Sequence, residues 1–575
     1  MEVTSATGVI PPSLPAKKSG NSENAVARAS RVFCNGTLLD AVQRAKLFED
    51  SKTFVDMPLR EEPEVVLAAF AKLERREDPD VLRSFINTYF LPPGDELKSW
   101  TPPDFKEMPP RLEAISDAAL RKWALALNSL WPSLGRIQDK AVALAPQRHT
   151  ALVRRYGMVI PGGRFRETYY WDTYWIVRGL LVCDMKDTAR GVVENLLDDV
   201  RNFGFVPNGG RIYYLDRSQP PLLTEMVLAV HEAAPDKCWL ASVLPLLERE
   251  YLFWMHPKGG RLVTVPAKSA HALNVFHSAS AHPRPESYTE DVYTAASAQE
   301  KLGRKPQEVY HALRAATESG WDFSSRWLAA GTGGTADLET INTSAVVPVD
   351  LNCMLYKMEL GLSRIHSELH VGDLPSRASS FYAKAAARRA CAIQEILWVE
   401  ADGSYRDFRL DAGIPSAVVS LSDYAAPAWA GLSCTSSHIA KAMLASLQKS
   451  GLIQAGGVST TTMCSGQQWD APNAWAPIEL MLIEGLDSLG HFPEAKDLAN
   501  EIASAWLHSN IEAWMSAGVM FEKYDAGRPG WSGAGGEYHP QIGFGWSNGV
   551  ALVLLDRRYR DSPAAKQALP IRSSL

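Results

Sequence analysis

The sequence has little of what marks disulfide-stabilised, zinc-ribbon or membrane proteins. Its seven cysteines are odd in number and show no CxxC spacing, so neither a disulfide framework nor a zinc ribbon is predicted. No run approaches the roughly 20 apolar residues that a membrane-spanning helix needs. The N-terminal stretch lacks an apolar signal core, and the C-terminal stretch lacks a hydrophobic anchor tail. We therefore expect a soluble, cytoplasmic protein, or a secreted one if the native N-terminus differs.

An excess of positive charge is also absent. The formal net charge is -6 and the pI is near 6.2, whereas nucleic-acid-binding proteins usually carry a basic face, so no nucleic-acid partner is expected. Hydrophobic residues make up 46% and charged residues 22%, as in a globular protein with a sizeable core. Tryptophan is plentiful, with 17 residues, several of them beside Asp, Arg or Gln. Such aromatic surfaces stack on the apolar faces of sugars, which favours a carbohydrate ligand.

The chain divides into two tails and one long region. Residues 1–32 are rich in Ser, Ala and Pro and lack periodicity, so they are predicted to be a disordered N-terminal tail. Residues 559–575 are predicted to be a short C-terminal tail. Between them we predict a single catalytic domain over residues 33–558.

Apolar residues at spacings of three and four recur through this region and predict helices. The clearest segments are 64–76, 116–131, 171–183, 188–203, 238–254, 350–369, 380–398, 437–451 and 493–514. Strand-like alternation is limited to residues 211–215 and 261–265. We therefore predict an all-α fold in which a ring of helical hairpins supplies rigidity and loops at one end carry the chemistry.

Several segments interleave charged and amide side chains with aromatic ones. They are residues 161–175, 206–223, 283–291, 318–327, 465–477 and 521–549. A neutral polyhydroxylated ligand needs this mixture, because its hydroxyls bind polar groups of fixed geometry and its ring faces need aromatic cover. These segments are predicted to form the binding site.

Acid–base catalysis requires two carboxyl groups in different environments. Asp322 lies between Trp321 and Phe323, apolar neighbours that would raise its pKa, so it is a candidate acid. Glu522 lies near a glycine-rich segment, and arginines close to it in space could keep it ionised as a base. From composition alone, many other carboxylates compete with this pair.

A metal site is not predicted. His366 and His370 have the spacing of a metal-binding pair on a helix, but no glutamate follows the first histidine as in zinc proteases, and a third ligand is not evident. We expect these histidines to lie on a solvated helix face.

Four segments together resemble one known family. "PGGRFRETYYWDTYW" (161–175) and "QQWDAPNAWAP" (467–477) closely resemble the two signature segments of the trehalases, family 37 of the glycoside hydrolases. "ESGWDFSSRW" (318–327) and "GGEYHPQIGFGWSNG" (535–549) look like further blocks in the same order. The likeness runs from about Phe33 to about Asp556, and its N-terminal part is similar to animal-type members. One departure is Ala534, which interrupts the glycine run before "GEY".

The resemblance implies a fold, a reaction and a set of site residues. The fold would be an (α/α)6 toroid with long active-site loops and a few short strands. The reaction would be hydrolysis of α,α-trehalose to two glucose molecules with inversion at one anomeric carbon, without metal or cofactor. By motif, Asp322 would be the general acid and Glu522 the general base. Sugar-binding positions would be Arg164, Trp171, Asp172, Asn208, Arg217, Ser218, Gln219, Arg284, Pro285, Glu286 and Gly320, with Trp469, Asp470 and Glu537 as further pocket members.

Roles follow for some of these residues and their neighbours. The arginines would hold sugar hydroxyls and keep Glu522 ionised. Glu167 would orient Arg164 or Arg166, while Tyr169 and Tyr170 would chiefly pack.

Two alternatives stay open at this stage. The fold could act on another α-linked disaccharide, or the protein could bind sugar without turning it over. In each case we expect a monomer or a weak oligomer with a small-molecule ligand.

Overall fold

The computed structural model describes residues 20–265, 271–329, 337–370 and 376–560. Most of these residues lie in helices, and the strands are short, as in the hairpin of β4 (Leu262–Val265) and β5 (His271–Asn274). The predicted all-α class is therefore confirmed.

Six helices of the described chain form a closed inner ring, because each contacts the next and the last contacts the first. In order around the ring they are α10 (Tyr170–Val182), α12 (Leu223–Ala233), α16 (Val349–Leu369), α18 (Ser422–Trp429), α20 (Ala476–Ser488) and α22 (Gly545–Tyr559). A helix enclosed on every side must be apolar on every face. In α20 the consecutive residues Leu480, Met481, Leu482 and Ile483 are all buried.

A second layer of helices packs against the ring. It consists of α7 (Ala118–Asn128), α11 (Lys186–Phe203), α13 (Lys237–Met255), α17 (Arg377–Ile396), α19 (Ser437–Lys449) and α21 (Pro493–Ala517). Most of them contact the inner helix nearest in sequence, as α17 contacts α16 and α21 contacts α20. The two layers together make an (α/α)6 toroid.

Glycines let the ring close between its first and last helices. A Cβ atom added to Gly179 of α10 would lie 2.6 Å from the Cα atom of Gly549 in α22. A Cβ atom added to Gly549 would lie 2.3 Å from the carbonyl oxygen of Trp175. The two helix backbones are therefore in direct contact, which a side chain at either position would prevent.

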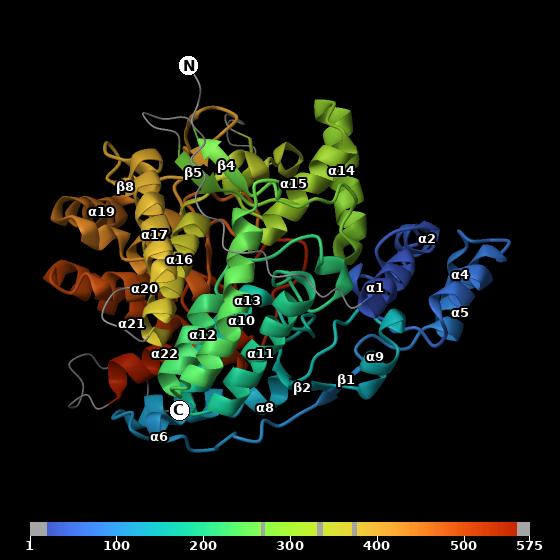
Figure 1. The fold of residues 1–575 in the computed structure, drawn as a ribbon, viewed down its shortest axis with the longest axis horizontal. Helices are drawn as coiled ribbons and strands as arrows, with labels where there is room; N and C mark the ends of the chain where they lie inside the picture. Colours follow the sequence, from blue (N-terminus) through green and yellow to red (C-terminus); the bar gives the residue numbers. More distant parts are fainter. Residues whose placement is uncertain (1–19, 266–270, 330–336, 371–375, 561–575) are drawn as a thin grey trace.

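The N-terminal residues form a separate lobe beside the ring (Figure 1). It contains α1 (Gly20–Phe33), α2 (Thr37–Arg44), α4 (Pro63–Ala71) and α5 (Pro79–Tyr89), and its core includes Tyr213 and Tyr214 from the loop before α12. The prediction of disorder for residues 1–32 is wrong from Gly20 onward. Ala29 and Val32 are fully buried at helical spacing, a signal that the surrounding polar residues obscured.

The remaining tail predictions fall mostly outside the described residues. Residues 1–19 and 561–575 are not described, while Tyr559 ends α22 and so is not part of a tail.

Each predicted helical segment contains a helix, as residues 350–369 lie in α16 and residues 493–514 in α21, but the segment 64–76 is helical only to Ala71, where α4 ends. The strand-like segment 261–265 is confirmed by β4. The other, 211–215, is wrong, because residues Ile212–Tyr214 form a short 3-10 helix. Both faces of that segment are buried, so its apolar pattern does not report a half-exposed strand.

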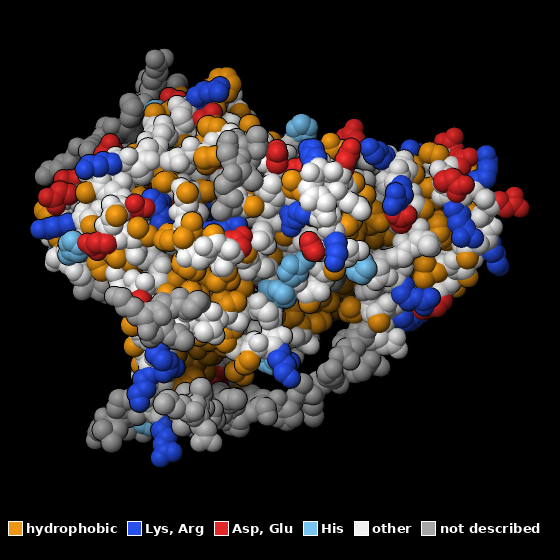
Figure 2. All heavy atoms as spheres, turned by 90° about the horizontal axis from the view of Figure 1, so that it is seen from above, with side chains coloured by type: hydrophobic (Ala, Val, Ile, Leu, Met, Phe, Trp, Pro, Cys, Tyr) orange, Lys and Arg blue, Asp and Glu red, His pale blue; other side chains and the backbone are white. Residues whose placement is uncertain are grey.

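No described helix is both long and apolar enough to cross a membrane. On the face drawn in Figure 2, acidic and basic side chains are interspersed over the surface.

Candidate active site

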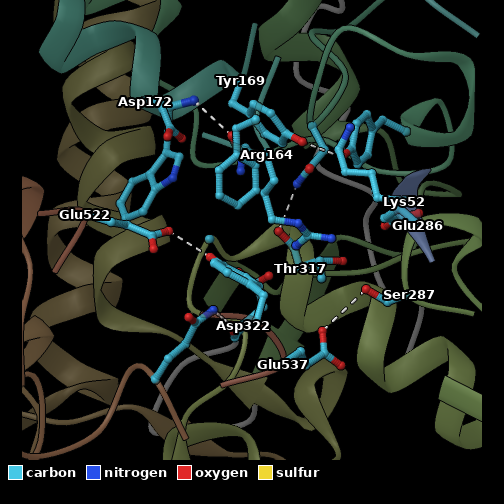
Figure 3. A pocket seen from close by; sticks show the side chains of 18 of the residues that line it. Lys52, Arg164, Tyr169, Asp172, Glu286, Ser287, Thr317, Asp322, Glu522 and Glu537 are labelled. Atoms are coloured by element: carbon cyan, nitrogen blue, oxygen red, sulfur yellow. Dashed lines mark hydrogen bonds between the residues drawn. The ribbon is translucent and has the colours of Figure 1, made fainter. Parts of the chain in front are cut away.

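A pocket opens at the end of the ring where the inner helices begin. Its walls come mainly from the segments that precede α10, α12, α14 (Tyr288–Leu302), α20 and α22, together with the end of α15 (Pro306–Glu318) and the turn after it. The space free of protein atoms in the pocket and at its opening is about 690 Å³, part of which is open solvent. Figure 3 shows side chains from these separate segments converging on the pocket.

Most of the residues predicted for the site line this pocket. They are Arg164, Trp171, Asp172, Asn208, Arg217, Gln219, Arg284, Glu286, Gly320, Asp322, Trp469, Glu522 and Glu537. The segments that carry them lie far apart in the sequence, and the toroid brings them together.

Ser218, Pro285 and Asp470 are not among the residues that line this pocket, so their assignment to sugar binding stays a prediction. The Ser218 hydroxyl donates to the carbonyl of Val206 (2.7 Å). The Pro285 carbonyl accepts from Gln43 (3.3 Å). Asp470 is fully buried, with Ser324, Ser325, Thr461 and Ser465 as its hydrogen-bond donors. These groups brace the loops behind the pocket wall.

Asp322 follows a sharp turn at the end of α15. Gly320 has a φ of +73°, and a Cβ atom there would lie 2.8 Å from the Trp171 ring, so the turn requires glycine. Burial raises the pKa of Asp322 to about 7, with Arg284 opposing the shift and Glu537 adding to it. The flanking Trp321 and Phe323 are both buried, as expected. Asp322 therefore keeps its proton to near-neutral pH.

Glu522 lies between α21 and the short strand β14 (Tyr524–Asp525). One carboxylate oxygen accepts from the Tyr538 hydroxyl (2.8 Å) and the other from the Gln541 N–H (3.0 Å). Burial raises its pKa above the ordinary value, while Lys523, these two donors and Arg164 favour the ionised form. Arg164 thus helps to keep Glu522 ionised, as predicted, but it is one of several groups that do so. Lys523 opposes the effect of burial on the pKa of Glu522 most strongly.

Arg164 is held from the N-terminal lobe. Its Nε and Nη2 atoms donate to the two carboxylate oxygens of Asp50 at 2.8 and 2.7 Å, and its guanidinium carbon lies 4.6 Å from the centre of the Tyr538 ring. The prediction that Glu167 orients Arg164 or Arg166 is wrong. Glu167 instead lies 2.8 Å from the Lys52 ammonium and 3.1 Å from Arg211, because it belongs to a buried charge cluster under the lobe.

Arg217 and Arg284 are also neutralised by carboxylates. Arg217 donates to Glu286 (2.5 Å) and Asp216 (3.0 Å). Arg284 donates to Asp291 (2.6 Å) and to Glu537 (2.8 Å).

Two buried polar atoms of this wall lack a partner in the described protein. Arg217 Nε and Glu286 Oε2 are buried and have no hydrogen-bond partner among the described residues. Buried polar atoms are nearly always hydrogen-bonded, so a donor and an acceptor are left for ligand hydroxyls.

Asp172 adds a third carboxyl group. Burial raises its pKa well above the ordinary value, and the neighbouring Glu522 and Asp322 raise it further. A carboxyl group kept protonated can donate a hydrogen bond to a sugar oxygen.

Tryptophan rings form one wall of the pocket. The rings of Trp469 and Trp475 are parallel, with centroids 4.1 Å apart, and Trp171 lies 5.6 Å from Trp469. Trp546 meets Trp475 edge to face at 5.6 Å. Trp469 also stacks on Trp321 (4.9 Å), so its two faces are covered by other tryptophans and the wall is a tightly packed apolar surface at the pocket.

The sequence analysis missed several lining residues: Lys52, Phe165, Tyr169, Tyr214, Ser287, Thr317, Gln468, Trp475, Tyr538, Phe544 and Trp546. Most of them lie inside the segments singled out above, where nothing in the residue types separates a lining side chain from a packed one. Tyr169, expected to pack, also lines the pocket, and its hydroxyl donates to Glu167 (2.5 Å). Lys52 lies outside those segments and carried no signal.

No group of three or more potential metal ligands is found among the described residues. His366 lies 2.9 Å from Glu248 and stacks on Tyr382, so it is a partly buried partner of a carboxylate.

Comparison with known proteins identifies relatives along nearly the whole chain. The family model described as Trehalase matches residues 46–558. Human trehalase is 40% identical over 534 residues, which cover 92% of this chain and 89% of the relative. Trehalase of the beetle Tenebrio molitor is 38% identical over 538 residues, 92% of this chain and 95% of the relative.

A solved structure agrees with the fold. Neutral trehalase Nth1 from Saccharomyces cerevisiae superposes with a TM-score of 0.55 at 26% identity, and the match covers 71% of this chain and 74% of the yeast chain. The toroid expected from the resemblance is therefore confirmed, and the chain belongs to the trehalase family.

Proposed function

We propose that this protein hydrolyses α,α-trehalose to two glucose molecules with inversion at one anomeric carbon. The observation that carries the proposal is the meeting of two buried carboxyl groups, Asp322 and Glu522, in one pocket lined by tryptophans and neutralised arginines. The relatives named trehalase support this choice of substrate.

Asp322 acts as the general acid in this proposal. Its raised pKa keeps the proton available, and it passes that proton to the bridging oxygen as the bond from this oxygen to the anomeric carbon breaks. The leaving glucose departs neutral.

Glu522 acts as the general base. It takes one proton from a water molecule whose oxygen forms the new bond to the anomeric carbon from the opposite face. In inverting glycosidases the two carboxyl groups stand roughly 6.5–9.5 Å apart, which leaves room for that water. The hydrogen bonds from Tyr538 and the Gln541 N–H fix the carboxylate for this step.

The remaining pocket residues bind the two glucose rings. Arg217 Nε and Glu286 Oε2 pair with sugar hydroxyls, and the tryptophan wall provides apolar contact for a ring. Trehalose carries no net charge, and the arginines of the pocket are already paired with Asp50, Glu286 and Glu537. The site is therefore matched to hydroxyls and not to an anionic group.

Replacement of each carboxyl group tests the assignment. We expect Asp322→Asn and Glu522→Gln each to lose at least about 10³-fold in kcat on trehalose, near the contribution of positioned acid–base groups, while trehalose still binds in calorimetric titration. Glu49→Gln is the matched control, because Glu49 lies at the mouth and does not line the inner pocket. Near-normal turnover by either catalytic variant would refute the assignment.

A further inference from the structure

Lys523 is a fully buried lysine that follows Glu522 directly and does not line the pocket. Glu522 lines the pocket, whereas the Lys523 ammonium group is bonded within the protein. A buried ammonium group is costly unless its protons are bonded, so its partners indicate what it holds.

The ammonium group of Lys523 connects three segments. It donates to Gln468 Oε1 (2.8 Å) and to the carbonyl oxygen of Gly535 (2.9 Å). The amide nitrogen of the same Gln468 donates to the carbonyl oxygen of Asp322. A chain of hydrogen bonds therefore runs from the segment of the proposed base to the backbone of the proposed acid.

The Gly535 contact holds one end of the loop of residues 533–541, in which Glu537 and Tyr538 line the pocket. The other end is held by Glu522 itself, which accepts from Tyr538 and from the Gln541 N–H. Between these ends, Glu537 pairs with Arg284 (2.8 Å). Lys523 and Glu522 thus fasten the same loop at two points.

Two glycines of this loop lie directly against the side chains of Lys523 and Gln468. A Cβ atom on Gly533 would lie 2.9 Å from Lys523 Cγ, and one on Gly536 would lie 2.8 Å from Gln468 Oε1. Ala534 is exposed, and both of its backbone groups are bonded to the Asn473 side chain. The loop is seated closely, and the alanine that interrupts the glycine run does not disturb it.

We infer that Lys523 is a positioning residue: its ammonium group sets the mutual placement of the Glu522 segment, the Gly535 end of the loop and, through Gln468, the Asp322 segment. The inference rests on the proposed function, because it concerns the spacing of the proposed acid and base. Lys523 acts through other residues and does not touch the substrate.

The positive charge of Lys523 predicts a change in the pH profile of activity, which a role in packing alone would not produce. The charged and titratable groups that act on Glu522 are Lys523, Arg164 and Tyr538, with Asp172 coupled to it across the pocket. Among them Lys523 does most to favour the ionised carboxylate. Its removal therefore moves the acidic limb of the kcat/KM profile to higher pH, because the base would lose a proton only at higher pH.

The experiment compares Lys523→Met and Gln468→Leu with the wild type on trehalose and on α-glucosyl fluoride. Fluoride leaves without protonation, so the fluoride substrate reports on the base and the water alone. We expect Gln468→Leu to lose about 10²-fold in kcat on trehalose, as for a misplacement near 1 Å, and much less on the fluoride. Lys523→Met should lose activity on both substrates and show the shifted acidic limb.

Lys357→Met is the matched control. It removes a partly buried ammonium group, which is paired with Glu225 (3.4 Å) outside the pocket lining, and should leave the substrate ratio and the profile unchanged. A folded Lys523→Met variant with an unshifted acidic limb would overturn the inference. If that variant does not fold, Gln468→Leu decides: an equal loss on both substrates overturns the inference, and a larger loss on trehalose supports it.

Failure of the proposed function is recognised separately. In that case the wild type itself releases no glucose from trehalose. The pH profiles of the wild type and of Lys523→Met on α-glucosyl fluoride can still be compared, and they show whether the substitution shifts the acidic limb.

Discussion

At the scale of single residues, Asp322 and Glu522 share burial but differ in what surrounds them. Asp322 follows a turn between buried aromatic residues, whereas Glu522 accepts two hydrogen bonds and adjoins Lys523. Both pKa values lie above their ordinary values. The proposed roles of the two groups therefore differ in the form, protonated or ionised, in which each group works. The acid works protonated, and the base works ionised.

The pH dependence of activity follows from these shifts. The pKa of Asp322 is raised to about 7, so its proton is present below that pH and is lost as the pH rises through about 7. Glu522 must be ionised, and its raised pKa brings the acidic limb above the pH at which an ordinary glutamate titrates. We expect a bell-shaped profile of kcat/KM against pH with its alkaline limb near pH 7. The measurement is a series of initial rates on trehalose at different pH values. If the Asp322→Asn variant shows the same alkaline limb as the wild type, the assignment of Asp322 is contradicted.

Gly320 is the residue at which the turn and the tryptophan wall meet. Gly320→Ala strains a backbone with φ +73° by roughly 1–3 kcal/mol and presses its Cβ atom on Trp171, so both the melting temperature and kcat/KM should fall. Gly413→Ala is the control: its φ is +69°, but no atom lies within 4 Å of the added Cβ. It should lower stability only, and an equal loss of activity in both variants would show that the contact with Trp171 does not matter.

At the scale of elements, the inner helices hold the site through the loops that precede them, and the N-terminal lobe completes it. Asp50 lies in the lobe, between α2 and the short helix α3 (Lys52–Val55), yet it binds both ends of the Arg164 fork. Lys52 from the same segment lines the pocket. The lobe is therefore part of the active site and not an appendage to it.

Removal of this clamp should be felt in substrate binding. Asp50→Asn replaces an ionic, bidentate partner with a neutral one, so we expect about a tenfold loss in kcat/KM on trehalose, mostly through a higher KM. Glu49→Gln, which changes the neighbouring carboxylate without a bond to Arg164, serves as the control in the same kinetic assay. An unchanged KM for Asp50→Asn would show that Arg164 needs no support from the lobe.

At the scale of the whole molecule, the sequence predicts the helices well because their signal is local. The apolar spacing within residues 350–369 lies on one helix, α16, and is readable without knowledge of its neighbours. The buried tyrosines of residues 211–215 were misread, because their burial depends on a lobe built from residues far away in the chain. Local patterns report local structure, and tertiary burial can override them.

The site was predictable where motifs carry it and not where distant partners do. Asp322 and Trp171 lie inside segments of unusual composition, and both line the pocket. Asp50 is 114 residues from Arg164, and Glu167, the closer carboxylate in sequence, is committed to Lys52 and Arg211. Nothing in a linear sequence states which carboxylate reaches which arginine, because the packing of the lobe on the ring decides it.

The central claim is inversion at one anomeric carbon of trehalose by the Asp322 and Glu522 pair. Proton NMR of the first turnovers, recorded before the sugars mutarotate, tests it most directly. The account predicts one equivalent each of α- and β-glucose from every trehalose consumed. Release of α-glucose alone, as a retaining enzyme would give, or of no glucose at all, would contradict it.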